Sequence, residues 1–149
     1  AWGPERLRAT DGGMTATGAE MTLRRAEGGL QVTRPGDRIE GFAHRVLAHD
    51  DAGPGIEGRY ASDETGGTLE ITSAGGALFG RFTGLLGAGP MHPVNPVGRD
   101  LLALACPRSM DAPAPGDWAI QVRRDGAGAV SGLVIGCWLA RNVPYRRVA

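Results

Sequence analysis

The sequence contains no lysine, because all 16 of its basic residues are arginine. Any mechanism that needs a side-chain amine as nucleophile or base is therefore excluded within this chain. The 16 acidic residues balance the arginines, so the formal net charge is zero. A nucleic acid or an anionic membrane surface would be bound by an excess of basic residues, which this chain lacks. We expect neither as a partner.

Aromatic residues and cysteines are also scarce. Aromatic residues make up 5% of the chain, and the two cysteines are Cys106 and Cys137. The cysteines form no CxxC pair and have no histidine at the spacing of a metal site. Their apolar neighbours favour buried free thiols over a disulfide. We expect no metal ion and no other cofactor.

Long apolar runs are absent as well. No stretch approaches the roughly 20 apolar residues of a membrane span, and no secretory signal pattern is present. The chain begins with Ala-Trp-Gly-Pro rather than with an initiator methionine. We therefore expect a piece of a longer protein, with a cytoplasmic location and the periplasm left open.

Glycine, in contrast, is abundant, with 25 residues in 149. From residue 56 onward, turns rich in glycine separate eight short runs in which apolar and polar residues alternate. Such alternation is typical of half-buried β-strands, and no amphipathic helix is evident. A meander of eight strands removes its exposed edges by closing into a barrel. The predicted fold is all-β, with an eight-stranded antiparallel up-and-down barrel of the lipocalin-like type and extra strands before it.

The alternation also predicts which side chains point into the barrel. The predicted inward residues are Tyr60, Leu69, Ile71, Phe82, Trp118, Ile120, Val122, Leu133 and Ile135. Trp118 is expected to be largely buried. The run 89–98 contains three prolines and is predicted to be a bent or edge strand at best, because proline has no amide N–H to donate.

Residues 1–50 differ from the rest of the chain. They contain about three strand-like runs, with turns at 27–29 and 34–37. Three strands do not easily bury a core of their own. Residues 1–50 are therefore interpreted as the end of a preceding β-domain or as hairpins packed on the barrel. The polar, glycine- and proline-containing stretch 51–55 is the predicted linker, and residues 56–149 form the predicted barrel.

Catalytic patterns are lacking. There is no GxSxG motif, and the cluster that begins at Ser62 precedes a hairpin turn, as turn-forming residues do. His44 and His49, with Asp50 and Asp51, match no metal-ligand spacing and are interpreted as solvated residues. His92 has no partner near it in the sequence.

One connection does not follow the pattern of strands and tight turns. The stretch "CPRSMDAPAPGDW" (106–118) has three prolines, charges of both signs and no regular period. It is the longest connection without strand character, and its prolines limit its conformational freedom.

Several strings of the sequence resemble the C-terminal barrel domain of D-aminopeptidases, which are serine hydrolases related to penicillin-binding proteins and class C β-lactamases. The resemblance is good over residues 56–149 and weak over 1–50. The strings that carry it are "GRYASDETGGTLEI", "GPMHPVNPVGRDLLAL", "CPRSMDAPAPGDWAIQVRRDG" and "ARNVPYRRV".

The resemblance implies a catalytic domain followed by two eight-stranded barrels, with a loop of the last barrel reaching into the active site. Residues 1–50 would then end the first barrel, and the chain would carry no catalytic residue. The expected partner is the serine-hydrolase catalytic domain of the same polypeptide, with a homodimer left open. We assign the pocket loop to 107–117 because this connection is long and stiffened by proline. The loop residues expected at the substrate pocket are Pro107, Arg108, Ser109, Met110, Asp111, Pro113, Pro115 and Asp117.

Two other functions compete with this interpretation. A lipocalin-like barrel could bind a small apolar ligand in its interior. The bulky predicted inward residues argue against such a cavity. An independent enzyme would need a nucleophile and a base, and the sequence brings no such pair together.

Overall fold

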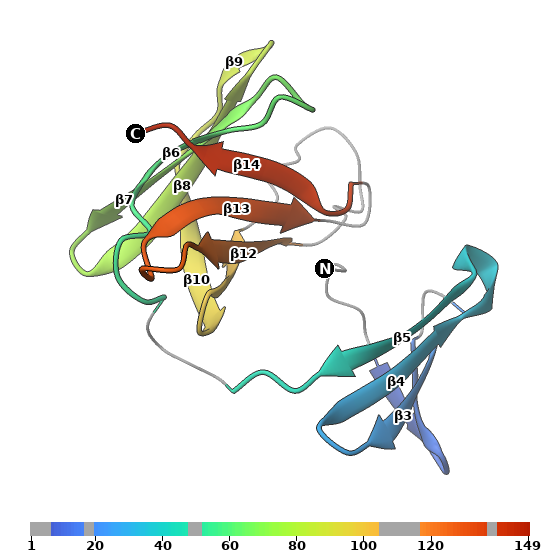
Figure 1. Cartoon of the computed structure of the whole chain (residues 1–149). Coiled ribbons are helices and arrows are strands. Elements are labelled where there is room, and N and C mark those ends of the chain that lie inside the picture. Colours follow the sequence, from blue (N-terminus) through green and yellow to red (C-terminus); the bar gives the residue numbers. More distant parts are fainter. Residues whose placement is uncertain (1–6, 17–19, 48–51, 105–116, 137–139) are drawn as a thin grey trace. The chain divides into compact units, whose positions relative to one another are not determined.

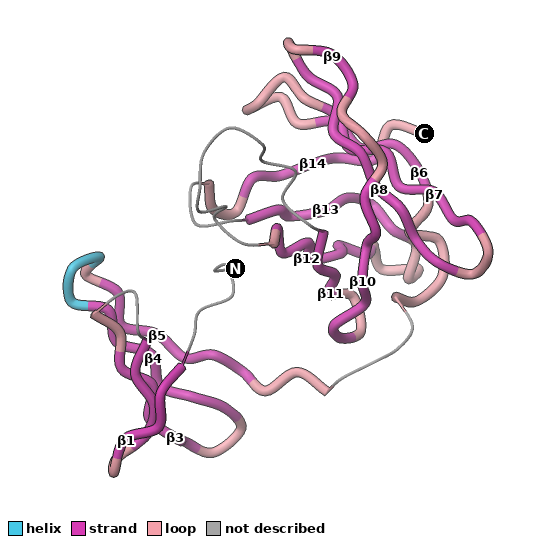
Figure 2. The backbone as a smooth tube through the Cα atoms, turned by 180° about the vertical axis from the view of Figure 1, so that it is seen from behind, coloured by secondary structure: helices cyan, strands magenta, loops and turns pink. Residues whose placement is uncertain are grey.

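The computed structural model describes residues 7–16, 20–47, 52–104, 117–136 and 140–149. Within these ranges the chain consists of β-strands, turns and one short 3-10 helix, η1 (Pro35–Asp37), as Figures 1 and 2 show. No helix in these ranges is long and apolar enough to cross a membrane. The backbone contacts divide the chain into two compact units, one within Pro4–Leu47 and one within Ala48–Ala149.

The N-terminal unit is a five-stranded antiparallel meander in which each strand pairs with the next. Two of its strands, β1 and β2, lie where the sequence pattern predicted none. Glycine- and threonine-rich runs such as 13–16 show little alternation of apolar and polar residues, so the sequence pattern does not indicate strands there. They form strands because their backbones pair with neighbouring strands. The strands are β1 (Leu7–Thr10), β2 (Gly13–Ala16), β3 (Thr22–Ala26), β4 (Gly29–Arg34) and β5 (Ile39–His44).

The core of this sheet is small. Only Ala16, Met21 and Leu23 are buried among its described residues, with Met14, Leu30 and Val32 packed against them. The two predicted turns are confirmed, one between β3 and β4 and one at η1. The small size of this core agrees with the expectation that a few strands do not bury a large hydrophobic core alone.

The C-terminal unit is a closed antiparallel barrel of eight strands, as predicted, and it carries one extra short strand, β9, which was not predicted. Consecutive strands pair as a meander, β14 pairs with β6, and β8 pairs with β10 to close the barrel. The strands are β6 (Gly58–Ala61), β7 (Thr68–Ala74), β8 (Ala77–Gly84), β9 (Gly87–Ala88), β10 (His92–Gly98), β11 (Leu101–Leu104), β12 (Trp118–Arg124), β13 (Val130–Gly136) and β14 (Val143–Arg147).

The proline-containing run was predicted to be a bent or edge strand at best, and the edge alternative is wrong because β10 is paired on both sides. Its first three residues pair with β8, and its residues from Val94 onward pair with β11. Pro93 is paired only with β8 and Pro96 only with β11. Each proline therefore interrupts no more than one ladder. The predicted bend is present, since the register with β11 shifts between Pro96 and Gly98.

Seven of the nine predicted inward side chains are buried in the barrel core. They are Tyr60, Leu69, Ile71, Ile120, Val122, Leu133 and Ile135. Phe82 and Trp118 pack against this core but are only partly buried. Partial burial is compatible with the prediction of a largely buried Trp118, and its indole nitrogen is buried. Trp118 is the first residue of β12 and lies at the end of the barrel, where fewer neighbours cover it.

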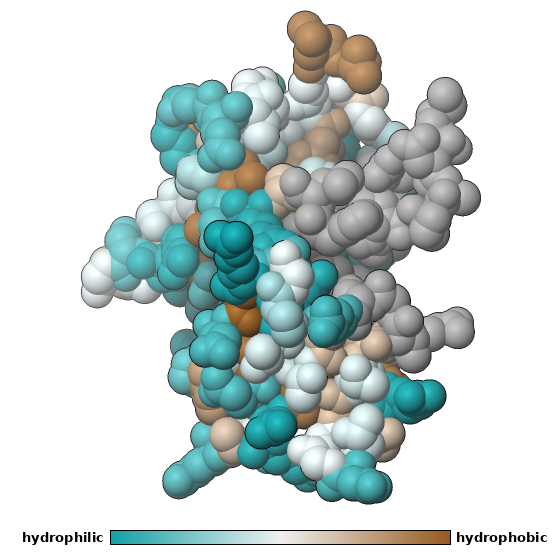
Figure 3. Space-filling view, turned by 90° about the vertical axis from the view of Figure 1, so that its right-hand side faces the viewer, coloured by the Kyte–Doolittle hydropathy of each residue, from teal (hydrophilic) through white to brown (hydrophobic). Residues whose placement is uncertain are grey.

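The barrel surface carries one marked apolar feature. Leu85 and Leu86, between β8 and β9, are both 101% exposed. The space-filling view shows a strongly hydrophobic protrusion at the top of the picture (Figure 3). Single exposed leucines are ordinary on a protein surface, but two adjacent ones at a hairpin tip are not.

Candidate functional site

The base of the predicted pocket loop lies at one end of the barrel. Asp117 is exposed and directly precedes β12, whose first residue Trp118 pairs with Leu104 at the end of β11. Asp117 is the only predicted loop residue within the described ranges. The other predicted loop residues lie outside them: Pro107, Arg108, Ser109, Met110, Asp111, Pro113 and Pro115. Cys106, Cys137, His49, Asp50 and Asp51 lie outside them as well.

Aromatic side chains anchor this end of the barrel. The Phe82 and Trp118 rings have centroids 4.8 Å apart and are tilted by 41°. The Tyr145 ring lies 6.2 Å from Phe82 in an edge-on arrangement, and its hydroxyl is 3.3 Å from the Thr65 hydroxyl. Because these rings come from β8, β12 and β14, the cluster ties three strands together at the point where the loop begins and ends.

Two buried side-chain nitrogens at this end have no hydrogen-bond partner among the described residues: Trp118 Nε1 and His92 Nε2. Trp118 pairs with Leu104, and Leu104 pairs with Val94, so the three form one row across the barrel wall. His92 precedes Val94 by two positions and therefore shares its inward face. The indole can only donate a hydrogen bond, whereas the imidazole nitrogen donates or accepts according to its tautomer. Within the described residues, this end of the barrel thus holds two buried polar groups without a partner.

Arginines at the other end of the barrel bind the chain segment that leads into β6. Arg124 Nη2 lies 2.8 Å from Asp100 Oδ1, and its Nη1 donates to the Pro54 carbonyl oxygen at 3.0 Å. The hydrogen bond to Asp100 raises the pKa of Arg124 above its ordinary value. Arg147 donates to the carbonyl oxygens of Gly55 at 2.6 Å and Glu57 at 2.7 Å.

The backbone of this segment also fits the contact with Arg124. Gly53 has φ +74°, and a Cβ placed on it would come within 2.9 Å of Arg124 Nη2. The conformation therefore favours glycine there, and a larger residue would displace the Arg124 guanidinium from its present position. Ala52 is 5% exposed and belongs to the barrel core. Part of the stretch 51–55 that was predicted as a linker is thus bound to the barrel. Sequence reasoning had no signal for this, because the arginines lie about 70 and 90 residues further along the chain.

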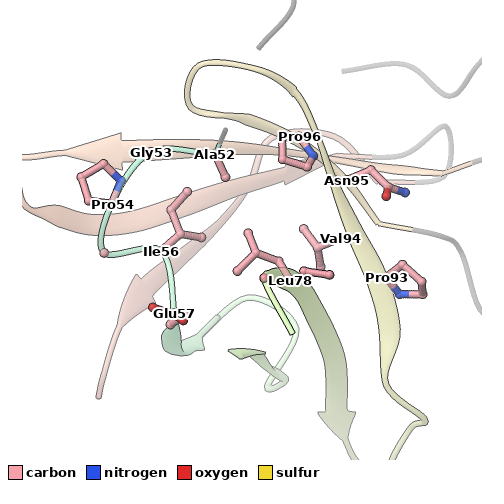
Figure 4. A pocket seen from close by; sticks show the side chains of 13 residues that line it. Ala52, Gly53, Pro54, Ile56, Glu57, Leu78, Pro93, Val94, Asn95 and Pro96 are labelled. Carbon is pink, nitrogen blue, oxygen red and sulfur yellow. The ribbon is translucent and has the colours of Figure 1, made fainter. Parts of the chain in front are cut away.

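A pocket of about 590 Å³ lies where this segment crosses the seam between β8 and β10 (Figure 4). The side chains of Ile56, Leu78 and Val94 lie close together in it and form its apolar part. Among the described residues that line it, Glu57 is the one that is ionisable. This described lining therefore offers no pair of nucleophile and base of the kind that a hydrolase needs.

Other polar residues that the sequence brings to notice have structural partners. Ser62 is 3% exposed, its backbone N–H donates to Gly67, and its hydroxyl accepts from the Thr65 N–H at 3.4 Å. Ser62 therefore shapes the turn between β6 and β7, as predicted. His44 is exposed and contacts the Phe42 ring. The described ranges contain no cluster of three or more side chains suited to a metal ion.

Several known proteins are similar to this chain in sequence. The family model described as D-aminopeptidase, domain B, matches residues 2–146. A D-aminopeptidase of Cereibacter sphaeroides is 47% identical over 150 residues, which are 99% of this chain and 28% of that protein. D-aminopeptidases of Brucella anthropi and Brucella melitensis biotype 1 are 44% and 40% identical, over 89% and 98% of this chain.

The chain thus spans only 25–28% of the length of these relatives. The resemblance seen in the sequence is confirmed, and it reaches further than the strings that carried it. The family model also includes the N-terminal sheet, where the resemblance was weak. The chain belongs to the D-aminopeptidase family and corresponds to the region that the domain B model describes.

Proposed function

We propose that this chain is a non-catalytic accessory region of a D-aminopeptidase-type serine hydrolase. It packs on the catalytic domain of the same polypeptide and shapes the substrate pocket through the loop 107–117. The observation that carries the proposal is the family membership of a chain that spans about a quarter of its relatives. The relatives are named for a peptidase activity, and most of their length lies outside the region that this chain matches.

The geometry of the barrel supports a role for the loop. Its base stands on the Phe82–Trp118 contact, which is part of a closed barrel. A rigid base together with three prolines lowers the entropy cost of holding the loop in one shape. Nine large side chains that are fully buried, including Tyr60 and Ile56, occupy the interior and argue against an apolar ligand there.

The loop residues supply the chemistry that a pocket wall needs. Asp111 and Asp117 carry carboxylates that pair with the amino group of a substrate or with the neighbouring domain, and Arg108 carries a charge that pairs with an acidic group of that domain. Met110 provides an adaptable apolar contact. Pro107, Pro113 and Pro115 hold the backbone, and Ser109 adds a short hydrogen-bonding group.

The test replaces residues 108–116 by a Gly-Asn turn in the full-length enzyme. Lost wall contacts should change the ratio of kcat/KM between a small and a large D-amino-acid amide, since each contact contributes about 1–3 kcal/mol of discrimination. Ala127→Ser, in an exposed turn at the other end of the barrel, is the control and should leave this ratio unchanged. An equal change for both substrates, or none, would show that the loop is a simple connector.

The absence of catalysis in the isolated chain is a separate part of the proposal. The purified chain should release no product from D-alanine p-nitroanilide, because its sequence contains no motif that pairs a nucleophile with a base. Turnover that persists through repurification and resists inhibition of contaminating hydrolases would refute the accessory role.

A further inference from the structure

The hairpin of β8 and β9 presents two leucines to solvent in a defined way. Thr83 pairs with Ala88 and Gly84 with Gly87, which leaves Leu85 and Leu86 as the two residues of the tip. The backbone N–H of Gly89 also donates to the Phe82 carbonyl oxygen at 2.8 Å. Gly87 has φ +96°, a conformation that favours glycine and allows this tight turn. The leucines therefore stand on a hydrogen-bonded ladder.

The hairpin projects from the same end of the barrel as the proposed pocket loop. Phe82, three residues before Leu85, packs against Trp118, which directly follows the loop. The β8–β9 hairpin and the base of the loop are thus linked through the Phe82–Trp118 contact. A surface that receives the loop would meet the hairpin tip as well.

The size of the tip indicates what covers it. Two leucine side chains offer on the order of 200 Å² of apolar surface. A stable interface between separate proteins buries about 800 Å² on each partner, so the tip alone is too small to hold a second molecule. Within one polypeptide the effective concentration is in the millimolar range, and a small apolar contact is then sufficient.

We propose that Leu85 and Leu86 form an apolar plug that inserts into a hydrophobic pocket on the remaining part of the same D-aminopeptidase polypeptide. This inference rests on the proposed accessory function and deepens it by naming a docking element. The plug fixes the barrel end against its neighbour, while the loop 107–117, whose described base is at Asp117 and Trp118, contributes to the substrate pocket. The preformed hairpin keeps the entropy cost of this docking low.

The test is cysteine labelling in the full-length protein. Leu86→Cys introduces a thiol at the tip, and Val97→Cys places one on β10, where Val97 is 45% exposed. Iodoacetamide modification at each site is followed by peptide mass spectrometry, so that Cys106 and Cys137 do not interfere. If the plug is inserted, the Leu86→Cys thiol should react at least tenfold more slowly than the Val97→Cys thiol.

Each result has a distinct meaning. Equal or faster reaction at Leu86→Cys overturns the plug. Protection that disappears on dilution, together with a dimer by light scattering, assigns the tip to a second copy and also overturns the plug.

The double variant Leu85→Ser/Leu86→Ser should weaken docking, which would be seen as faster hydrogen exchange at the Phe82–Trp118 rim. The matched pair Val46→Ser/Leu47→Ser, also adjacent and exposed, should leave that exchange unchanged.

The plug and the proposed function fail independently. A protected Leu86→Cys thiol with an ineffective loop replacement would retain the docking and reject the pocket role of the loop. An unprotected thiol with an altered substrate ratio would do the opposite.

Discussion

The Tyr60 hydroxyl donates a 2.6 Å hydrogen bond to the backbone carbonyl oxygen of Ile56, four residues earlier, inside the barrel. Tyr60 has no exposed surface and Ile56 is 2% exposed. The bond holds the segment before β6 against the end of the barrel. The guanidinium carbon of Arg147 lies 5.9 Å from the centre of the Tyr60 ring. One buried phenol thus links the core to the arginines that bind the same segment.

Tyr60→Phe should lower the free energy of unfolding by about 1–3 kcal/mol, because it leaves the buried Ile56 carbonyl without a donor. Urea unfolding followed by fluorescence measures this change. Tyr145→Phe, whose hydroxyl has a longer 3.3 Å contact in a partly exposed site, is the comparison and should cost less. An equal cost for both variants would contradict the special role of the Ile56 bond.

The stability of the barrel should fall at alkaline pH. Burial raises the pKa of Tyr60 above its ordinary value of 10.0, while Arg147 and Arg124 act in the opposite direction. The folded state therefore holds the phenol proton more tightly than the unfolded state. The resulting stability is complete below the unfolded pKa and is lost as the pH rises through the folded pKa.

Urea midpoints measured between pH 8 and pH 11 test this linkage. The decline above about pH 10 should be shallower in Tyr60→Phe than in the unmodified chain. Identical slopes would mean that the Tyr60 phenol does not contribute to the alkaline loss.

Arg124→Gln should destabilise the barrel by about 1–2 kcal/mol, since it leaves Asp100 and the Pro54 carbonyl oxygen without their donor. Its side chain is 18% exposed, so solvent screens the ion pair only in part. Arg123→Gln removes a neighbouring exposed arginine and should change stability by less than about 0.5 kcal/mol. Equal urea midpoints for the two variants would show that the contact with the segment before β6 contributes little.

Trp118→Ala should cost about 2–3 kcal/mol, below the usual range for fully buried aromatic residues, because the ring is only partly buried. Trp118→Phe should cost less than about 1 kcal/mol. It keeps the contact with Phe82 and removes a buried indole N–H that has no partner among the described residues. Circular dichroism during urea unfolding gives both values. A loss in Trp118→Phe as large as in Trp118→Ala would indicate that the indole N–H is bonded after all.

Much of the barrel could be predicted because its strands are half-buried. Apolar residues alternate with polar ones on these strands, as Leu69 and Ile71 do on β7 and Ile120 and Val122 on β12. This period of two indicates which face of the strand points into the barrel. The hairpin turns were equally readable, since Ser62 and the glycines near it provide the turn chemistry. The alternation at 118–122 does not report how much surface remains exposed, so it could not show that Trp118 keeps part of its surface in solvent while Ile120 does not.

The sequence by itself determined the class of the fold, the inward face of most barrel strands and, through its irregular loop string, the family. Only the tertiary structure decided that β10 is an interior strand, that Arg124 and Arg147 bind the segment 54–57, and that two leucines stand fully exposed on a hairpin tip. The physical reason is range. Periodicity and turn chemistry depend on residues that are neighbours in the chain. Barrel closure and the arginine contacts join residues up to about 90 positions apart. A local sequence pattern therefore does not predict such pairs.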